Sequence, residues 1–269
     1  CGVSLLVPSS KWRSVVGNSK QLEDCDSKDD WCWSFSSSVN GREQLRLLQK
    51  ASQPWTPQLD KIAVIQIVVQ INYTRPYLTN YQKDILDCDA RFTITAASTK
   101  TGKTASHIIW LFEQALQCKD GQSVWWVAPV YQQAEIAFRR MKNQVTDKNF
   151  FISNETKLLL TLPTGARIEF KSGEKPDNLY GDDVFAAVID EASRMREESW
   201  YALRSTLTAT QGKCKLIGNV KGKKNWFYKL GERAKLGEQD YEYFKITAYD
   251  AVNEGILQLE EIEQAKIRA

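Results

Sequence analysis

The segment at residues 97–104, with the sequence A-S-T-K-T-G-K-T, constrains the fold of this chain most strongly. Its pattern A-x-x-x-x-G-K-T departs only at the first residue from the common phosphate-binding loop G-x-x-x-x-G-K-[ST]. An apolar stretch at residues 92–96 predicts a short strand before the loop, and apolar residues at helical spacing predict a helix over about residues 103–117 after it. Strand, loop and helix in this order predict an α/β fold with a P-loop.

The chemistry of such a loop depends on its backbone and on two side chains. Backbone N–H groups and the helix N-terminus point at phosphate oxygens. Lys103 would reach the β and γ phosphates of ATP, and the Thr104 hydroxyl would bind Mg²⁺. Alanine at the first position is acceptable if that position does not need a positive φ. A chance G-K-T in a turn before a helix is the alternative. The predicted nucleotide-binding residues are Ala97, Ser98, Thr99, Lys100, Thr101, Gly102, Lys103 and Thr104.

Strands and helices continue to alternate after the P-loop, which predicts a mainly parallel central sheet flanked by helices. The strand at residues 184–189 is apolar at consecutive positions, as expected of a strand buried on both faces. Residues 158–162 and 166–170 flank Pro163-Thr164-Gly165, which predicts a β-hairpin insertion. The other predicted elements are a strand at residues 123–128, a helix at residues 131–143 and a strand at residues 215–218.

An adjacent acidic pair, Asp190 and Glu191, follows the apolar strand directly. An acidic pair is usually a solvated turn, but the carboxyl end of a buried strand is where α/β proteins bind ligands. Asp190 would hold Mg²⁺, and Glu191 would orient and deprotonate the attacking water. The P-loop and the acidic pair together predict hydrolysis of a nucleoside triphosphate.

Composition excludes several other classes of protein. The chain has 269 residues, a net charge of +3, six cysteines without a zinc-ligand spacing, and one histidine, so we expect reduced thiols and no histidine-rich metal site. The longest apolar run, at residues 62–71, is too short to span a bilayer. We expect a poorly defined extension at residues 1–72, a P-loop ATPase domain at 73–250 and the start of a linker at 251–269.

Several segments resemble, in their order, the ATPase domain of the tailed-phage terminase large subunit. They are Y-L-T-N-Y-Q at residues 77–82, the P-loop, V-W-W-V-A-P at 124–129, L-Y-G at 179–181, the acidic strand, and G-N-V-K-G at 218–222 followed by Asn225 to Tyr228. The resemblance covers about two-thirds of the chain, from Tyr77 to about Tyr249. It implies that Gln82 contacts the adenine edge and that Asn219 couples loss of the γ-phosphate to movement. Trp125 and Trp126 are better explained as core residues.

The resemblance implies a motor that drives double-stranded DNA into a procapsid. The expected cofactors are ATP and Mg²⁺. The expected partners are a portal protein, a small terminase subunit and further copies of this chain in a ring, without a membrane. The expected location is the host cytoplasm, at the portal. Two departures matter. Thr99 stands where the family often carries an arginine, so Arg139, Arg140, Arg194 or a neighbouring subunit would have to supply one. No nuclease segment follows the linker, so we expect no nuclease activity from this chain.

A lysine- and arginine-rich run at residues 213–235 is the candidate DNA contact. Neutralisation of phosphates by such a patch gives sequence-independent, salt-sensitive binding. A solvated basic helix face is the alternative explanation. Three members follow Asn219 closely and are predicted to contact DNA: Lys221, Lys223 and Lys224.

Two other functions remain open at this point. A different P-loop motor, such as a helicase, would need a second motor domain carrying arginines. A non-catalytic nucleic-acid-binding module would keep the fold without hydrolysis. The second alternative is opposed by the presence of Lys103, Thr104, Asp190 and Glu191.

Overall fold

The computed structural model describes residues 2–7, 67–147 and 149–267, which fall into two units. The smaller unit takes residues 1–76 with 144–147, and the larger takes residues 77–143 with 148–269. In the smaller unit, β1 (Gly2–Val7) pairs antiparallel with β2 (Ile67–Asn72) in a two-stranded sheet. The predicted extension otherwise lies largely outside the described residues, and the predicted domain limits stay predictions.

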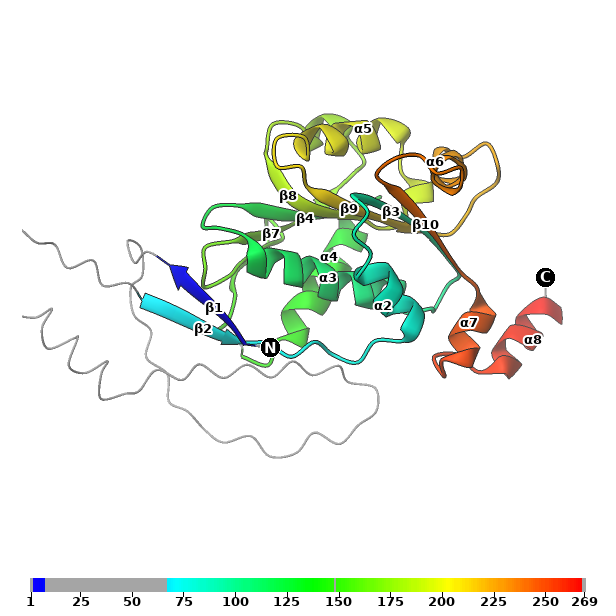
Figure 1. Cartoon of the computed structure of the whole chain (residues 1–269), viewed down its shortest axis with the longest axis horizontal. Helices are drawn as coiled ribbons and strands as arrows, with labels where there is room; N and C mark the ends of the chain where they lie inside the picture. The colour runs from blue at the N-terminus through cyan, green and yellow to red at the C-terminus, as the bar shows by residue number, and fades with distance from the viewer. Residues whose placement is uncertain (1, 8–66, 148, 268–269) are drawn as a thin grey trace, which may run out of the picture. The chain divides into compact units, whose positions relative to one another are not determined.

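The larger unit is built on an eight-stranded sheet in the order β10-β3-β9-β8-β4-β7-β6-β5 (Figure 1). The strands from β10 to β7 in this order run parallel, and β6 pairs antiparallel with both β7 and β5. The bounds are β3 (Phe92–Ala97), β4 (Ser123–Ala128), β5 (Ile152–Asn154), β6 (Leu159–Thr161), β7 (Arg167–Ser172), β8 (Val184–Ile189), β9 (Lys213–Gly218) and β10 (Tyr241–Ile246).

The predicted hairpin is confirmed as β6 and β7, but it is not an insertion set apart from the sheet. Gly165 turns the chain with a φ of 82°, and β7 then pairs parallel with β4 along its whole length. The hairpin therefore extends the central sheet. Leu160, Ile168 and Phe170 of the hairpin are buried, because one face of β7 continues the face of β4.

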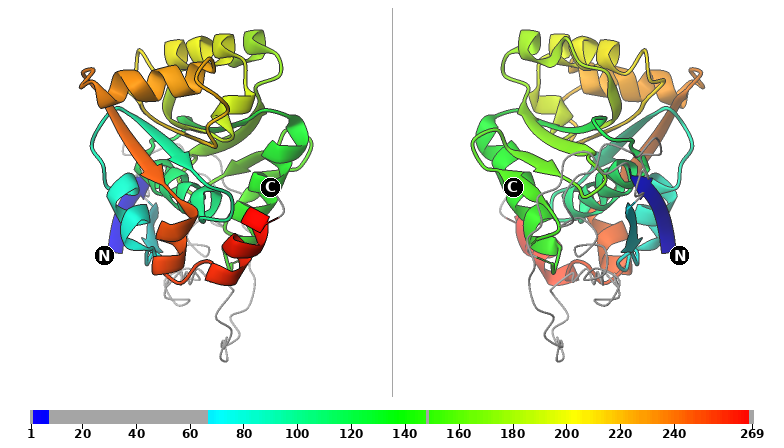
Figure 2. Two further views of the ribbon diagram at one scale, coloured as in Figure 1. Left: turned by 90° about the vertical axis from the view of Figure 1, so that its right-hand side faces the viewer. Right: turned by 90° about the vertical axis from the view of Figure 1, so that its left-hand side faces the viewer.

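Helices cover both faces of this sheet, as expected for parallel strands joined by crossover helices. Figures 1 and 2 show α5 and α6 on one face and α2, α3 and α4 on the other. The bounds are α2 (Asn80–Leu86), α3 (Lys103–Gln117), α4 (Tyr131–Gln144), α5 (Glu197–Thr206), α6 (Trp226–Lys235), α7 (Ala248–Asn253) and α8 (Leu259–Ile267), with short 3-10 helices η1 (Pro176–Leu179) and η2 (Ala192–Arg194).

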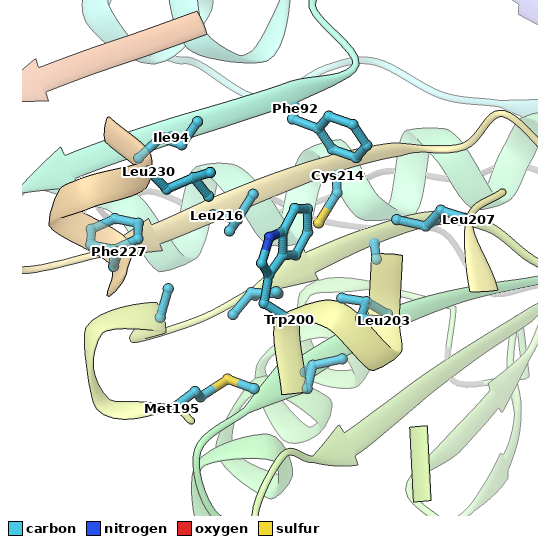
Figure 3. Packing of buried hydrophobic residues seen from close by; sticks show 14 of the residues in the cluster. Phe92, Ile94, Met195, Trp200, Leu203, Leu207, Cys214, Leu216, Phe227 and Leu230 are labelled. Atoms are coloured by element: carbon cyan, nitrogen blue, oxygen red, sulfur yellow. The ribbon is translucent and has the colours of Figure 1, made fainter. Parts of the chain in front are cut away.

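A hydrophobic cluster joins α5 and α6 to the sheet (Figure 3). Phe92 of β3 meets Trp200 of α5 edge to face, with ring centroids 5.4 Å apart. Trp125 and Trp126 are both fully buried, so their predicted place in the core is confirmed. Among the described residues, no helix is both long and apolar enough to cross a membrane.

Candidate nucleotide-binding site

The predicted P-loop joins the end of β3 to the start of α3 and is held by contacts at several points. Within the loop, the Thr101 hydroxyl donates to the Ser98 carbonyl at 3.0 Å. From α2, the Tyr81 hydroxyl donates to the Thr101 carbonyl at 2.8 Å. The Ser98 amide donates to the carbonyl of Ile246 on β10 at 3.0 Å. These bonds fix the loop before any ligand is bound, so its free backbone N–H groups are preorganised for an anion.

Backbone geometry explains which loop positions need glycine. Ala97 is the last residue of the extended strand β3, so the expectation that the first position does not need a positive φ is confirmed. Gly102 has a φ of 75°, and a Cβ there would lie 2.5 Å from Nε2 of Gln82. Lys100 takes a φ of 62°, which is uncommon outside glycine. The glycine that the motif keeps is therefore the one that the fold requires.

Lys103, at the start of α3, contacts two side chains that follow the ends of strands far from it in the sequence. Its side chain, only 7% exposed, projects from the first turn of α3. Its Nζ donates to Oδ1 of Asn219, just after β9, at 3.1 Å. The same Nζ lies 3.5 Å from Oε1 of Glu191, just after β8. The strand order places β9 between β3 and β8, so the three predicted side chains meet at one edge of the sheet.

Asp190 is a buried carboxylate at the end of β8, 8% exposed. Burial first, and then the negative charge of Glu191, raise its pKa to about 6, while Lys103 and Arg140 act in the opposite direction. Its Oδ1 accepts from the Glu191 amide at 3.0 Å, and Glu191 itself takes a left-handed conformation with a φ of 47°. The local charge balance therefore leaves this carboxylate short of compensating positive charge.

The donor set at this edge suits Mg²⁺. Asp190 supplies a buried, undercompensated carboxylate, and Thr104 supplies a half-buried hydroxyl at the start of α3. Hard oxygen ligands are those that Mg²⁺ prefers, and it takes few of them from the protein when phosphates supply the rest. The described residues contain no group of three or more His, Cys, Asp or Glu side chains that could hold a metal by themselves.

Gln82 lies against the P-loop rather than free at the surface. It is 3% exposed, and its Oε1 accepts from the Thr79 amide at 3.0 Å in the capping box that starts α2. The pattern T-x-x-Q could have indicated this cap from the sequence. The contact of Tyr81 with the P-loop had no such signal. The predicted contact of Gln82 with adenine stays a prediction.

A pocket of about 390 Å³ opens beside the P-loop, at the ends of β3, β9 and β10. Its wall includes Ser98, Thr99, Asn219, Tyr243, Lys245 and Thr247. Lys103, Asp190 and Glu191 are absent from this wall, so the pocket borders the phosphate site through Asn219 rather than containing it.

The basic run divides into exposed and buried members. Lys221, Lys223 and Lys224 are exposed in the loop between β9 and α6.

Lys215 is 2% exposed and donates to the Ile85 carbonyl at 2.7 Å, so its inclusion in a DNA-binding run was wrong. It lies on a buried central strand, where alternate side chains point into the helix layer. Other members are paired with acids: Lys213 with Asp89, Arg233 with Glu238 and Lys235 with Glu232.

The arginines considered as charge-stabilising groups differ in their surroundings. Arg139 is paired with Glu135 at 2.6 Å on the exposed face of α4. Arg140 is near enough to Asp190 to lower the pKa of that carboxyl group. Arg194 ends η2 and is exposed. Of the three, Arg140 is therefore the arginine whose charge acts on Asp190.

Fold and site together define a P-loop nucleoside-triphosphatase domain: a parallel sheet, a phosphate loop before α3, and an acidic pair at the end of a neighbouring strand. The sequence matches the family described as terminase large subunit, T4likevirus-type, N-terminal, over residues 94–267. The chain therefore belongs to this family, and the helicase alternative is not favoured.

Known relatives agree with this assignment. The terminase large subunits of Thermus phage G20c and Thermus virus P23-45 are each 28% identical over 197 residues, covering 60% of this chain and 40% of the relative. This chain thus spans about two-fifths of the length of these relatives. The large terminase ATPase domain of Thermus phage P74-26 superposes with a TM-score of 0.58 at 23% identity, over 66% of this chain and 84% of that one.

A large terminase from a thermophilic bacteriophage has the same fold. It superposes with a TM-score of 0.58 at 16% identity, over 70% of this chain and 49% of that one. That protein has also been solved in complex with ADP and with ATP-gamma-S.

Proposed function

We propose that this chain binds and hydrolyses ATP as the motor domain of a large terminase that moves double-stranded viral DNA into a procapsid. The observation that carries the proposal is the meeting of Lys103, Glu191 and Asn219 at one sheet edge. Family membership supports it, since terminase large subunits act in DNA packaging. The nucleotide complexes of the large terminase from the thermophilic bacteriophage support ATP as the ligand.

The contacts of Lys103 suggest how phosphate binding starts the reaction. Without nucleotide, its ammonium group neutralises the Glu191 carboxylate across 3.5 Å. An incoming phosphate competes for the same ammonium group, because its negative charge is larger and the loop N–H groups hold it close. Glu191 then loses its cation and becomes free to orient and deprotonate the attacking water. Occupancy of the phosphate site would thus release the base.

Asp190 and Thr104 would hold Mg²⁺. When bound, this ion neutralises the charge that builds on the phosphate oxygens. The positive charge would also offset the cost of burying the ionised Asp190 carboxylate, whose pKa is raised to about 6 by the protein alone. Gln82, placed 2.5 Å from where a Gly102 side chain would stand, is close enough to the loop to contact a bound nucleotide.

Asn219 offers a route from hydrolysis to movement. It bonds to Lys103 on one side and is followed directly by the exposed loop that carries Lys221, Lys223 and Lys224. A shift of Lys103 when the γ-phosphate leaves would be felt by Asn219 and then by these lysines. Contact of the lysines with DNA phosphates would convert that shift into force on the duplex.

The assembly follows from the same proposal. A ring of copies of this chain would work at a portal protein, with a small terminase subunit, in the host cytoplasm. An arginine for the site would come from Arg140, which already acts on Asp190, or from a neighbouring copy in the ring.

The test is ATP turnover by the purified chain with and without linear duplex DNA. Glu191→Gln should abolish turnover while ATP still binds, because the amide cannot accept the proton. Glu198→Gln, an exposed position at the start of α5, is the matched control and should turn over ATP like the parent. Turnover that persists in Glu191→Gln would remove Glu191 from its role. ATP binding without turnover by the parent would favour the non-catalytic module.

A further inference from the structure

Four polar residues are buried between the P-loop helix α3 and the central sheet, and we call them the buried polar layer. They are Thr93 and Thr95 of β3, His107 of α3 and Lys215 of β9. Each is at most 2% exposed. Phe92, Ile94 and Ala96 point into the cluster under α5 and α6, so the alternate residues Thr93 and Thr95 point to the α3 face. Lys215 is the register partner of Thr93, and its Nζ lies 4.9 Å from the Trp110 ring centroid on α3.

His107 has a defined tautomer. Its Nδ1 lies 2.7 Å from the carbonyl oxygen of Lys103, and a carbonyl oxygen can only accept. The Ser106 hydroxyl lies 3.2 Å from Nδ1, but it donates its proton to the same carbonyl oxygen at 3.0 Å and therefore does not donate to Nδ1. The ring is neutral, because burial first, then the charges of Lys215 and Lys103, lower its pKa to about 3. Nε2 is therefore an acceptor.

That acceptor has no donor among the described residues. Nε2 of His107 and the Oγ1 atoms of Thr93 and Thr95 are buried polar atoms without a hydrogen-bond partner in the part of the chain that the structure describes. Native proteins rarely leave such atoms unpaired, and internal water is the usual partner where several polar groups face one space. Lys215 adds donors, since its ammonium group has three N–H bonds and gives one to the Ile85 carbonyl.

We propose that the buried polar layer holds internal water that bridges His107 Nε2 to Thr93 and Thr95, and that His107 thereby positions the first turn of the P-loop helix. Water both donates and accepts, so it can satisfy the imidazole acceptor and the threonine hydroxyls together. On its other side His107 holds the carbonyl group of Lys103 itself. The layer would thus tie the residue that contacts phosphate to the central strands β3 and β9. The positioning role rests on the proposed ATP hydrolysis; the water site does not.

The first test measures the layer without any nucleotide. The chain contains one histidine, so nitrogen NMR reports His107 alone. We expect, near neutral pH, a neutral ring protonated at Nδ1 with a hydrogen-bonded Nε2, and nuclear Overhauser contacts from long-lived water to the methyl groups of Thr93 and Thr95. A ring protonated at Nε2, or threonine methyl groups without water contacts, would overturn the proposal.

Stability provides a second, independent test. If the threonine hydroxyls were dry and unpaired, replacing them with methyl groups would raise Tm, because an unsatisfied polar group would be removed. If they bind water, Thr93→Val and Thr95→Val should each lower Tm by about 3 °C. A rise in Tm for either variant would contradict the water site, so the test still holds if the other variant folds poorly.

The positioning role is tested by rescue. His107→Phe fills the space but loses both hydrogen bonds, and we expect kcat for ATP to fall roughly tenfold, as is typical when an orienting partner is lost. His107→Asn places its amide nitrogen near the position of Nδ1, so it should restore kcat to within about threefold of the parent. Equal loss in both variants, or none in His107→Phe, would contradict positioning. A parent without turnover would count against the proposed function, and the NMR result would still decide the water site.

Discussion

Asp190 is the residue whose ionisation state links the site to stability. Its pKa is raised from 3.8 to about 6, chiefly by burial. The fold therefore favours the neutral carboxyl group. This contribution to stability is complete below pH 3.8 and is lost as the pH rises through about 6. At neutral pH the ionised side chain therefore lowers the free energy of unfolding by about 3 kcal/mol.

Asp190→Asn should accordingly stabilise the protein without Mg²⁺ or nucleotide. At a pH above 7 we expect Tm to rise by about 5 °C, because the amide is neutral at every pH. Near pH 4 the two proteins should unfold at nearly the same temperature. Asp183→Asn, at an exposed position, is the matched control and should change Tm little at either pH. A stabilisation that does not depend on pH would contradict the burial of the charge.

The residues at and below the nucleotide-binding site show what local sequence can and cannot predict. Lys103, Glu191 and Asn219 were predictable because each follows a recognisable strand or loop pattern. The burial of Lys215 was not, since a lysine two residues after Lys213 in a basic run indicates a surface, and only the register with Thr93 shows that it points under α3. Hydrophobic periodicity tells which face of an element is buried, but a single polar residue on a buried strand leaves no mark in it.

At the scale of elements, segments with a strong apolar period were predicted to within a residue or two, and mixed ones were missed. The sequence predicted β3, β4, β8 and α3, whereas α6 and β10 were not foreseen. In α6 the charges hid an apolar face made by Trp226, Phe227, Leu230 and Ala234. The edge strand β10 is buried only at its two end residues, Tyr241 and Ile246, and it depends on pairing with β3, far away in the sequence.

The end of β9 passes very close to the turn that carries the acidic pair. A Cβ at Gly218 would lie 3.1 Å from the Ala192 amide nitrogen and 3.4 Å from that of Ser193, and both are backbone atoms that cannot swing aside. Gly218→Ala should therefore displace β9 or η2 and move Asn219 away from Lys103. We expect a loss of about 1 kcal/mol in stability and a larger loss in kcat for ATP.

A second glycine gives the matched control for this prediction. A Cβ at Gly231 of α6 would lie 2.9 Å from Cε2 of the Tyr243 ring, so Gly231→Ala introduces a comparable clash with a side chain of β10 rather than with the backbone of the acidic turn. Its side-chain neighbour can shift, and turnover per folded molecule should stay within about twofold of the parent. If Gly218→Ala turned over ATP as fast as Gly231→Ala, the close approach of β9 to the acidic turn would not matter for catalysis.

At the scale of the whole molecule, charge placement matters more than total charge. The net charge is only +3, which by itself predicts little affinity for DNA. Lys221, Lys223 and Lys224 concentrate the same amount of charge on one exposed loop next to Asn219. If this loop contacts the duplex, each lysine releases counterions from the DNA when it binds a phosphate.

Replacing Lys221, Lys223 and Lys224 by glutamine should therefore flatten the salt dependence of DNA binding. The slope of log K against log salt concentration should fall by roughly 2–3, about 0.9 for each phosphate that is no longer neutralised, without changing sequence preference. The control variant replaces Lys119, Lys157 and Lys175, three exposed lysines elsewhere in the fold, so that both proteins have the same net charge, +3 minus 3, or zero. If only the total charge governed binding, the slope would fall equally in the two variants. A fall confined to the first variant would place the DNA at the loop that follows Asn219, where a change at the nucleotide site can reach it.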